Sequence, residues 1–179
     1  EQHGRLLSVF HNRRWDADFL ALRALLADGR LGRPTQLESR FERFRPEVRA
    51  RWREQAVAGG GVWYDLGPHL VDQALQLFGL PNSVSARFAV QRDGAEADDW
   101  AQVDLDYGQL QVTLRASMLV AGGMPRFAAH GTAGSWVKYG LDCQEDQLKA
   151  GLRPGASDWG LDPQAPTLYA AAGSITTPQ

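Results

Sequence analysis

Residues 100–118 read WAQVDLDYGQLQVTLRASM and carry the clearest structural signal in the chain. Apolar and polar side chains alternate over 100–107 and again over 110–118. Alternation with a period of two places every second side chain on the same face of a β-strand. Because Gly108-Gln109 separates the two runs by a tight turn, this stretch predicts an antiparallel hairpin.

Two segments upstream of the hairpin have the apolar spacing of amphipathic helices. The first begins at Asp16 or Asp18, either of which is a suitable N-cap, and ends near Gly29. The second begins after the triple glycine 59–61 and ends at Gly79. Its apolar stripe falls on Leu66, Leu70, Ala74 and Leu77.

Shorter segments complete the predicted fold. Weaker alternation predicts strands over 35–44, 83–90, 126–131 and 135–139. A short polar helix is expected over 144–150, and the Gly- and Pro-rich tail from Gly151 is expected to be irregular coil. Helices followed by a run of strands predict an α+β domain, with an open, mostly antiparallel sheet and helices on one face. The other face would be wetted or covered by a subunit; it would carry Gln102, Asp104, Gln111, Thr113 and Arg115.

Composition excludes several classes of protein. Of the 179 residues, 44% are hydrophobic and 22% are charged, which is typical of a globular core and not of a disordered chain. The formal net charge of −2 gives no general indication of nucleic-acid binding. The single cysteine, Cys143, cannot form an intrachain disulfide. No apolar run reaches the ~18 residues of a membrane span, so we expect a cytoplasmic protein.

The beginning of the chain suggests a piece of a longer protein. The sequence starts without methionine, and an apolar segment, Leu6–Phe10, follows after only a few residues. We interpret this segment as a strand. On this interpretation, residues 1–12 are the last strand and junction of a preceding domain, and residues 13–179 form the α+β domain.

The densest group of chemically useful side chains lies in the second predicted helix. Asp65, His69 and Asp72 stand at positions i, i+4 and i+7, on one helix face opposite the leucine stripe. A carboxylate one turn from an imidazole can orient it for proton transfer. Pro68 means either that the main helix begins there or that it kinks. The alternative is structural: the two carboxylates are surface or capping groups, and His69 is a packed, hydrogen-bonded histidine.

A second feature is a concentration of arginine at 40–53. Most of these arginines fit a solvated face with internal ion pairs, because glutamates are interleaved with them. One or two could instead bind hydroxyls or phosphates at the edge of a cleft. We take Arg43 and Arg45 as the candidates. A metal site is not expected, since the four histidines are scattered and there is no Cys-x-x-Cys.

Residues 59–72 resemble the G-G-G-x-x-x-D-x-G-x-H-x-x-D signature of the Gfo/Idh/MocA oxidoreductases. Segments 9–16, 43–49 and 138–142 resemble the branch that contains scyllo-inositol dehydrogenases. The resemblance implies an N-terminal Rossmann domain that binds NAD or NADP, followed by an α+β domain for substrate and subunit contacts. This chain resembles the second domain, preceded by the last strand of the first.

The resemblance also implies roles for individual residues. Asp65 and His69 would be the catalytic pair, and Asp72 would hydrogen-bond a substrate hydroxyl. Asn12 and Arg13 would approach the cofactor from the junction. The family's catalytic lysine lies in a Glu-Lys-Pro motif, which this sequence lacks. The chain alone is therefore expected to be inactive.

The leading functional hypothesis is the substrate and assembly domain of an NAD(P)-dependent oxidoreductase acting on a cyclic polyol or sugar. It would form a homodimer or larger homo-oligomer through the open sheet. The alternative is a non-catalytic module for oligomerisation or carbohydrate binding. A third and weaker hypothesis is nucleic-acid binding by the arginines.

Overall fold

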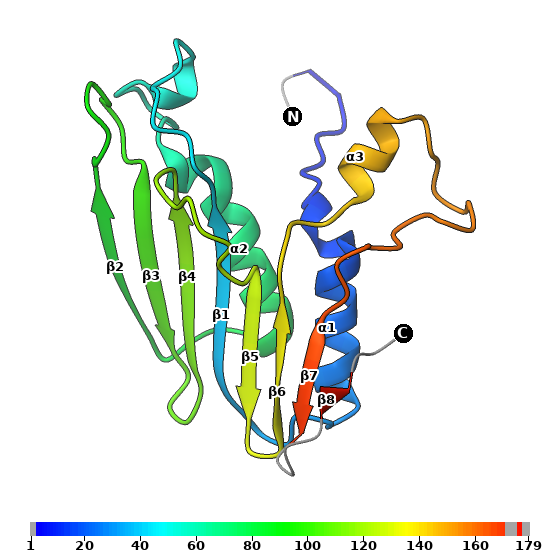
Figure 1. The fold of residues 1–179 in the computed structure, drawn as a ribbon. Coiled ribbons are helices and arrows are strands. Elements are labelled where there is room, and N and C mark those ends of the chain that lie inside the picture. The colour runs from blue at the N-terminus through cyan, green and yellow to red at the C-terminus, as the bar shows by residue number, and fades with distance from the viewer. Residues whose placement is uncertain (1–2, 171–174, 177–179) are drawn as a thin grey trace.

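The computed structural model describes residues 3–170 and 175–176, and its centre is one eight-stranded sheet (Figure 1). The order of the strands across the sheet is β2-β3-β4-β1-β5-β6-β7-β8. Neighbours are antiparallel except for β1 and β4, which are parallel. The strands are β1 (Pro34–Glu42), β2 (Ser83–Ala89), β3 (Trp100–Asp106), β4 (Gln111–Ser117), β5 (Phe127–Gly131), β6 (Gly134–Lys138), β7 (Thr167–Ala170) and β8 (Ile175–Thr176).

Two long helices, α1 (Ala17–Ala27) and α2 (Val62–Phe78), cover the same face of the sheet (Figure 1). A short helix, α3 (Gln144–Lys149), and the 3-10 turns η1 (Asn12–Trp15) and η2 (Trp52–Glu54) lie in the connections. The core forms between these layers, because the inward residues of β3 and β4 are buried as alternation predicts. The predicted α+β class and open, mostly antiparallel sheet are confirmed.

The predicted antiparallel hairpin is confirmed, and the structure gives its register. Asp106 pairs with Gln111 at the turn, and Trp100 pairs with Ser117 at the open end. Val103 and Leu114 face the helices and are almost fully buried. The polar residues between them lie on the opposite face, which no described helix covers.

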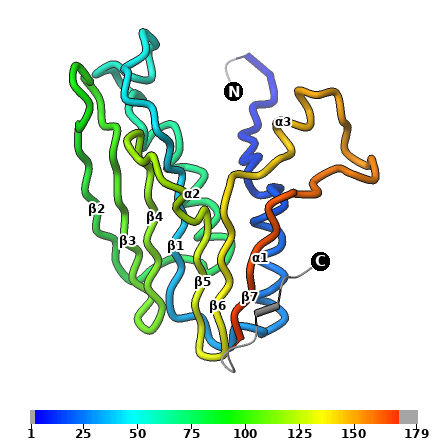
Figure 2. The backbone as a smooth tube through the Cα atoms, in the orientation of Figure 1, coloured from blue at the N-terminus to red at the C-terminus, as the bar shows by residue number. Residues whose placement is uncertain are grey.

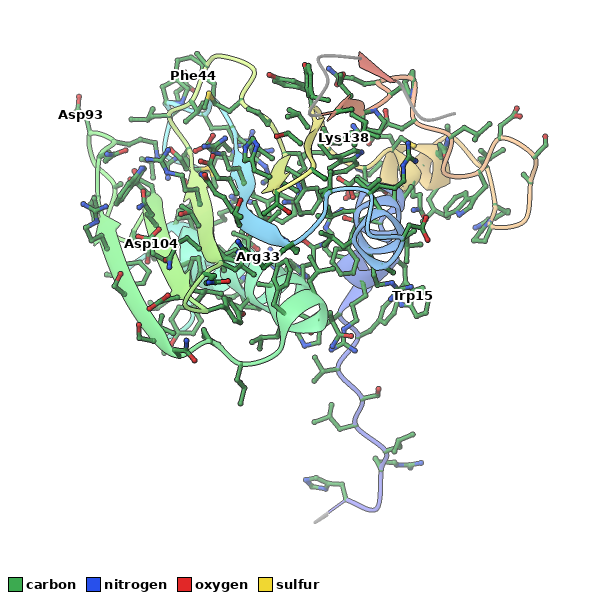
Figure 3. All side chains as sticks on the ribbon, turned by 90° about the horizontal axis from the view of Figure 1, so that it is seen from below. Trp15, Arg33, Phe44, Asp93, Asp104 and Lys138 are labelled. Atoms are coloured by element: carbon green, nitrogen blue, oxygen red, sulfur yellow. The ribbon has the colours of Figure 1, made fainter. Side chains whose placement is uncertain are left out.

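Two predictions about the ends of the chain are wrong. Leu6–Phe10 is not a strand: its side chains are largely exposed, Leu6 to 97%, and the segment extends away from the body (Figure 3). A strand needs a neighbour to take its backbone hydrogen bonds, and no described strand lies beside this segment. The tail is not all coil, because β7 pairs with β6 and β8 pairs with β7. The division at residue 12 stays a prediction.

The course of the chain brings the candidate residues to one end of the sheet. β1 ends where the 43–61 connection begins, and α2 starts at that same end (Figure 2). The segment before α1 also lies there (Figure 1). Residues from three separate parts of the sequence therefore surround the first turns of α2.

Candidate functional site

Gly61 fixes where α2 begins. Its φ of +99° lies in a region that residues with a Cβ rarely adopt. A Cβ at Gly61 would also stand 2.0 Å from Oδ1 of Asp98. Asp98 needs this space because its Oδ2 accepts a hydrogen bond from the Trp63 amide at 2.9 Å, and its carbonyl accepts one from the Val62 amide at 2.7 Å. Two of the free amides at the start of the helix are thereby satisfied.

The helix continues through Pro68, which rules out the alternative that the main helix begins at that residue. α2 begins six residues earlier, at Val62. Asp65, His69 and Asp72 consequently lie on one face of a continuous helix, and all three are partly buried. Their predicted grouping is thus present, although the structure does not test their chemical roles.

His69 is neither freely exposed nor a hydrogen-bonded core residue. Its Nδ1 is buried and has no hydrogen-bond partner among the described residues. Burial lowers the pKa of His69, and the nearby charges of Arg13 and His11 lower it further, while Asp65 and Asp72 act in the opposite direction. The imidazole is therefore neutral near pH 7 and is able to accept a proton.

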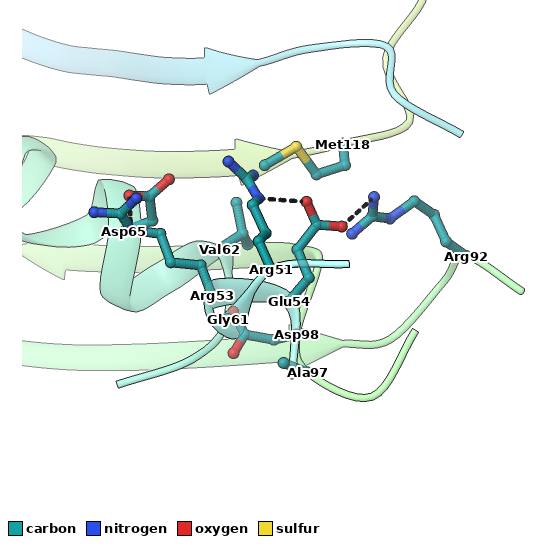
Figure 4. Close-up of a pocket in the computed structure, with 10 residues that line it drawn as sticks. All are labelled: Arg51, Arg53, Glu54, Gly61, Val62, Asp65, Arg92, Ala97, Asp98 and Met118. Carbon is teal, nitrogen blue, oxygen red and sulfur yellow. Dashed lines mark hydrogen bonds and ion pairs between the residues drawn. The ribbon is translucent and has the colours of Figure 1, made fainter. Parts of the chain in front are cut away.

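Asp65 lies in the first turn of α2, beside the arginine-rich connection. Nε of Arg53 is 3.3 Å from Oδ1 of Asp65 (Figure 4). Arg43 is partly buried, which lowers the pKa of its guanidinium, and the charges of Arg45, Arg13 and Arg51 lower it further, while Asp65 counteracts them. Asp65 therefore lies within the electrostatic field of several arginines of this connection.

The two arginine candidates are held at the end of β1 by their backbones. The amide of Arg43 donates to the carbonyl of Ser117, and that of Arg45 donates to the carbonyl of Met118. Neither side chain forms an ion pair with a described carboxylate. The role of Arg43 and Arg45 in binding a substrate stays a prediction.

The cavity that adjoins Asp65 is too small for a substrate. It has a volume of about 10 Å³ and lies between the arginine-rich connection and the start of α2 (Figure 4). That volume is about what one water molecule requires. A substrate therefore does not fit within this cavity.

Asp72 is engaged by Arg14 of η1. Nε and Nη2 of Arg14 donate to the two carboxylate oxygens of Asp72, at 2.7 and 2.5 Å. Such a bidentate pair fixes both side chains. A hydroxyl bound by Asp72 would have to share these oxygens with Arg14, and the substrate-binding role of Asp72 stays a prediction.

Asn12 and Arg13, the candidate cofactor residues, have different surroundings. Asn12 is exposed. The Arg13 guanidinium lies 3.4 Å from both Asp16 and Glu145, and 5.6 Å from the centre of the Phe41 ring. Arg13 thus joins η1 to α3 and to the sheet, while its charge reaches His69.

Part of the arginine-rich connection is buried, which sequence reasoning missed. Glu54 has an exposed fraction of 8% and contacts Nη1 of Arg92 at 3.1 Å and Nε of Arg51 at 2.8 Å. Arg92 also contacts Asp99 at 2.9 Å. Burial alone would raise the pKa of Glu54, but hydrogen bonds from Arg49 and Arg51 and the charge of Arg92 lower it overall. This network fixes the connection beside α2.

The buried contacts of Arg126 with β1 and α2 were also not predicted from the sequence. Arg126 is fully buried between the rings of Phe41 and Phe127, 4.0 Å from each ring centre. It donates to Ser39 at 2.6 Å and to Oε1 of Gln73 at 2.7 Å. One feature of the sequence could have indicated a buried polar contact here: Gln73 is a polar residue beside the apolar stripe of α2.

The described residues form neither a metal-binding cluster nor a membrane-spanning helix. No group of three or more His, Cys, Asp or Glu side chains in the described part of the chain is placed to hold a metal ion. None of the described helices is both long enough and apolar enough to cross a membrane.

Comparison with known proteins identifies the family. The chain is 55% identical over 159 residues to the uncharacterized oxidoreductase YdgJ of Escherichia coli, covering 89% of this chain and 46% of that protein. It is 45% identical over 177 residues to the scyllo-inositol 2-dehydrogenase (NADP(+)) IolW of Bacillus subtilis, covering 99% and 48%. The chain therefore spans about half the length of these relatives.

A solved structure and a family profile agree with these relatives. A crystal structure from Klebsiella pneumoniae superposes with a TM-score of 0.86 at 54% identity, covering 99% of this chain and 51% of that one. Residues 19–137 match the profile described as the GFO/IDH/MocA C-terminal domain. The chain thus belongs to the GFO/IDH/MocA family and corresponds to its C-terminal domain.

Proposed function

We propose that this chain is the substrate-binding and proton-transferring domain of an NAD(P)-dependent oxidoreductase that acts on a hydroxyl of a cyclic polyol or sugar. The observation that carries the proposal is His69. It is a partly buried imidazole with an unpartnered Nδ1, a lowered pKa and carboxylates on either side along α2. A structural histidine would have its ring nitrogens satisfied.

The chemistry assigned to His69 is transfer of one proton. When the alcohol is oxidised, its carbon loses a hydride and its oxygen loses a proton, which the neutral imidazole accepts. Asp65, one helical turn away, stabilises the imidazolium that results, since its charge raises the pKa of His69. In the reverse reaction, His69 returns the proton to the oxygen.

The nicotinamide, when bound, supplies the hydride acceptor. The residues of this chain fit only the edge of such a cofactor. Asn12 is exposed at the junction, and Arg13 is engaged by Asp16 and Glu145. The sequence contains no G-x-G-x-x-G loop to hold the phosphates. We therefore assign the cofactor mainly to another domain, and we expect the isolated chain to be inactive.

The proposed polyol substrate is supported by the relative IolW, whose name specifies scyllo-inositol and NADP. Arginine side chains donate readily to hydroxyl oxygens, and Arg43 and Arg45 stand at the end of β1 near Asp65.

The test uses a protein in which this chain is joined to its nucleotide-binding domain. His69→Ala should lower kcat for polyol oxidation by about 100- to 10,000-fold, with little change in the Kd for NADPH. The acidic limb of the pH profile should disappear as well, because protonation of His69 is what stops the unmodified enzyme at low pH. His130→Ala is the control, since that histidine lies on β5 and bonds Ser135. Unchanged turnover in His69→Ala would reject the catalytic role.

We also propose that a second copy covers the open face of the sheet. Three polar atoms on that face are buried yet have no partner among the described residues: Nε of Arg40, Oε2 of Glu42 and Nε of Arg115. Arg40 and Arg115 are neighbours across β1 and β4. Unpartnered buried polar atoms are costly, and side chains of this chain cover these three, so a second copy would satisfy them by displacing the side chains above them.

Sedimentation of the chain tests this assembly. A dimer or larger species is expected, and Thr113→Glu should weaken it because it adds a carboxylate, beside that of Asp104, to the face that the second copy would have to desolvate. Arg23→Glu on the exposed side of α1 is the control and should leave the association intact. If the unmodified chain sediments as a monomer, the assembly role is wrong.

A further inference from the structure

Gln73 is a buried polar residue of α2, one helical turn beyond His69. Its exposed fraction is 1%. Nε2 of Gln73 donates to the carbonyl of Arg13 in η1 at 2.8 Å, and its Oε1 accepts from Nη2 of Arg126 at 2.7 Å. Gln73 therefore joins three parts of the chain at one buried point: α2, the turn η1 and the residue that precedes β5.

The orientation of the Gln73 amide follows from the chemistry of its two partners. A guanidinium only donates and a carbonyl only accepts, so the amide satisfies both partners in one orientation. Arg126 is itself fixed, since its guanidinium lies 4.0 Å from the ring centres of Phe41 and Phe127. Its Nη1 also donates to Ser39 at 2.6 Å. The packing beneath α2 thus directs the donor of Gln73 at η1.

The other contacts of η1 are more exposed or lead elsewhere. Arg14 pairs with Asp72 on α2, but the Arg14 side chain is 41% exposed, and solvent weakens such a pair. Nε2 of Gln144 donates to the carbonyl of Trp15 at 2.8 Å, which joins η1 to α3 and not to α2. Among these contacts, the bond from Gln73 is the buried one that holds η1 against α2.

The place of η1 matters because of the charges that act on His69. Burial lowers the pKa of His69 most. The charges of Arg13 and His11, in and just before η1, lower it further. The carboxylates of Asp65 and Asp72, on the same helix as His69, act in the opposite direction. The balance of charge at the imidazole therefore depends on where η1 stands relative to α2.

We propose that Gln73 is a positioning residue for His69: by holding the backbone of Arg13 against α2, it fixes where the Arg13 guanidinium stands relative to the imidazole. The far end of that side chain is held by Asp16 and Glu145, each at 3.4 Å. Arg13 is thus fixed at its backbone and at its charge. The inference rests on the proposed function, because the charge of His69 governs turnover only if His69 transfers the proton.

The test is an NMR titration of the His69 ring in this chain, with His69→Ala to identify its resonance. Gln73→Met has a similar size but removes both hydrogen bonds. Because the Arg13 guanidinium is then no longer held near His69, the proton affinity of His69 should rise severalfold. In the protein joined to its nucleotide-binding domain, the acidic limb of the kcat profile should move to higher pH in parallel.

Ser39→Ala is the matched control. It removes one partner of Arg126 but leaves the bond from Gln73 to Arg13, so the titration of His69 should not change. Circular dichroism checks that each variant has folded. If Gln73→Met does not fold, Gln73→Glu takes its place in the double-mutant comparison below, since a carboxylate keeps the acceptor for Arg126.

A double-mutant comparison separates positioning from other effects of the substitution. Arg13→Gln removes the charge but keeps the carbonyl that Gln73 binds. It should also raise the proton affinity of His69. In that background Gln73→Met should add little, because no guanidinium is left to position.

Three results would overturn the inference. The first is an unchanged His69 titration in folded Gln73→Met. The second is an equal rise in Ser39→Ala, which would assign the effect to loosening around Arg126. The third is full additivity of the changes at Gln73 and Arg13. The titration needs no turnover, so a failure of the catalytic proposal, seen as unchanged turnover in His69→Ala, is distinguishable from a failure of this one.

Discussion

Replacing Gly61 by alanine tests how the start of α2 is positioned. Two costs add at this residue. A side chain at φ +99° is strained by about 1–3 kcal/mol. The new Cβ would also stand 2.0 Å from Oδ1 of Asp98, so that Asp98 must move and release the Trp63 amide, at a further cost of about 1–2 kcal/mol. We therefore expect a loss of about 3–4 kcal/mol and a fall in Tm of roughly 10 °C.

The matched control is Gly29→Ala. Gly29 also has a positive φ, +68°, but a Cβ there would meet nothing within 4 Å. That variant should lose only about 1 kcal/mol, which is the backbone strain alone. Thermal and urea unfolding of the two variants and of Asp98→Ala gives the comparison, and the double variant should be less than additive. Equal losses for Gly61→Ala and Gly29→Ala would refute the assigned contact with Asp98.

Two further predictions concern buried acids. The folded pKa of Asp16, about 7, lies above its unfolded value, so the folded state binds more protons than the unfolded chain between about pH 4 and 7, and stability falls as the pH rises through this window. Asp16→Asn should remove this fall. In urea unfolding, the free energy of unfolding of the variant minus that of the unmodified chain should therefore increase between pH 4 and pH 8, by at most about 4 kcal/mol. A difference that stays constant over this range would contradict the raised pKa of Asp16. Glu54→Gln should lose about 2 kcal/mol at pH 7, because the buried Arg92 then keeps only Asp99 as a charged partner. The exposed Glu96→Gln is its control, and equal stability of these two variants would show that Glu54 does not anchor the connection.

Local signals were sufficient for most of the elements. The period-two alternation of 100–118 predicted β3, β4 and their antiparallel hairpin, and the leucine spacing predicted α2. The same reasoning failed for β7, because that strand is only four residues long and its partner, β6, lies some 30 residues earlier. For Leu6–Phe10 the same reasoning predicted a strand that the structure does not contain. The composition favoured a strand, but none of the described strands lies beside this segment to pair with it.

Within the site, the sequence by itself determined the spacing of Asp65, His69 and Asp72, because the geometry of one helix follows from local residue types. Only the tertiary structure decided their surroundings. Arg14 reaches Asp72 across 58 residues, and Arg13 reaches Glu145 across 132. Such contacts depend on how the chain packs, and burial then sets which groups keep their charge, since the pKa of a side chain responds to neighbours that the local sequence does not contain.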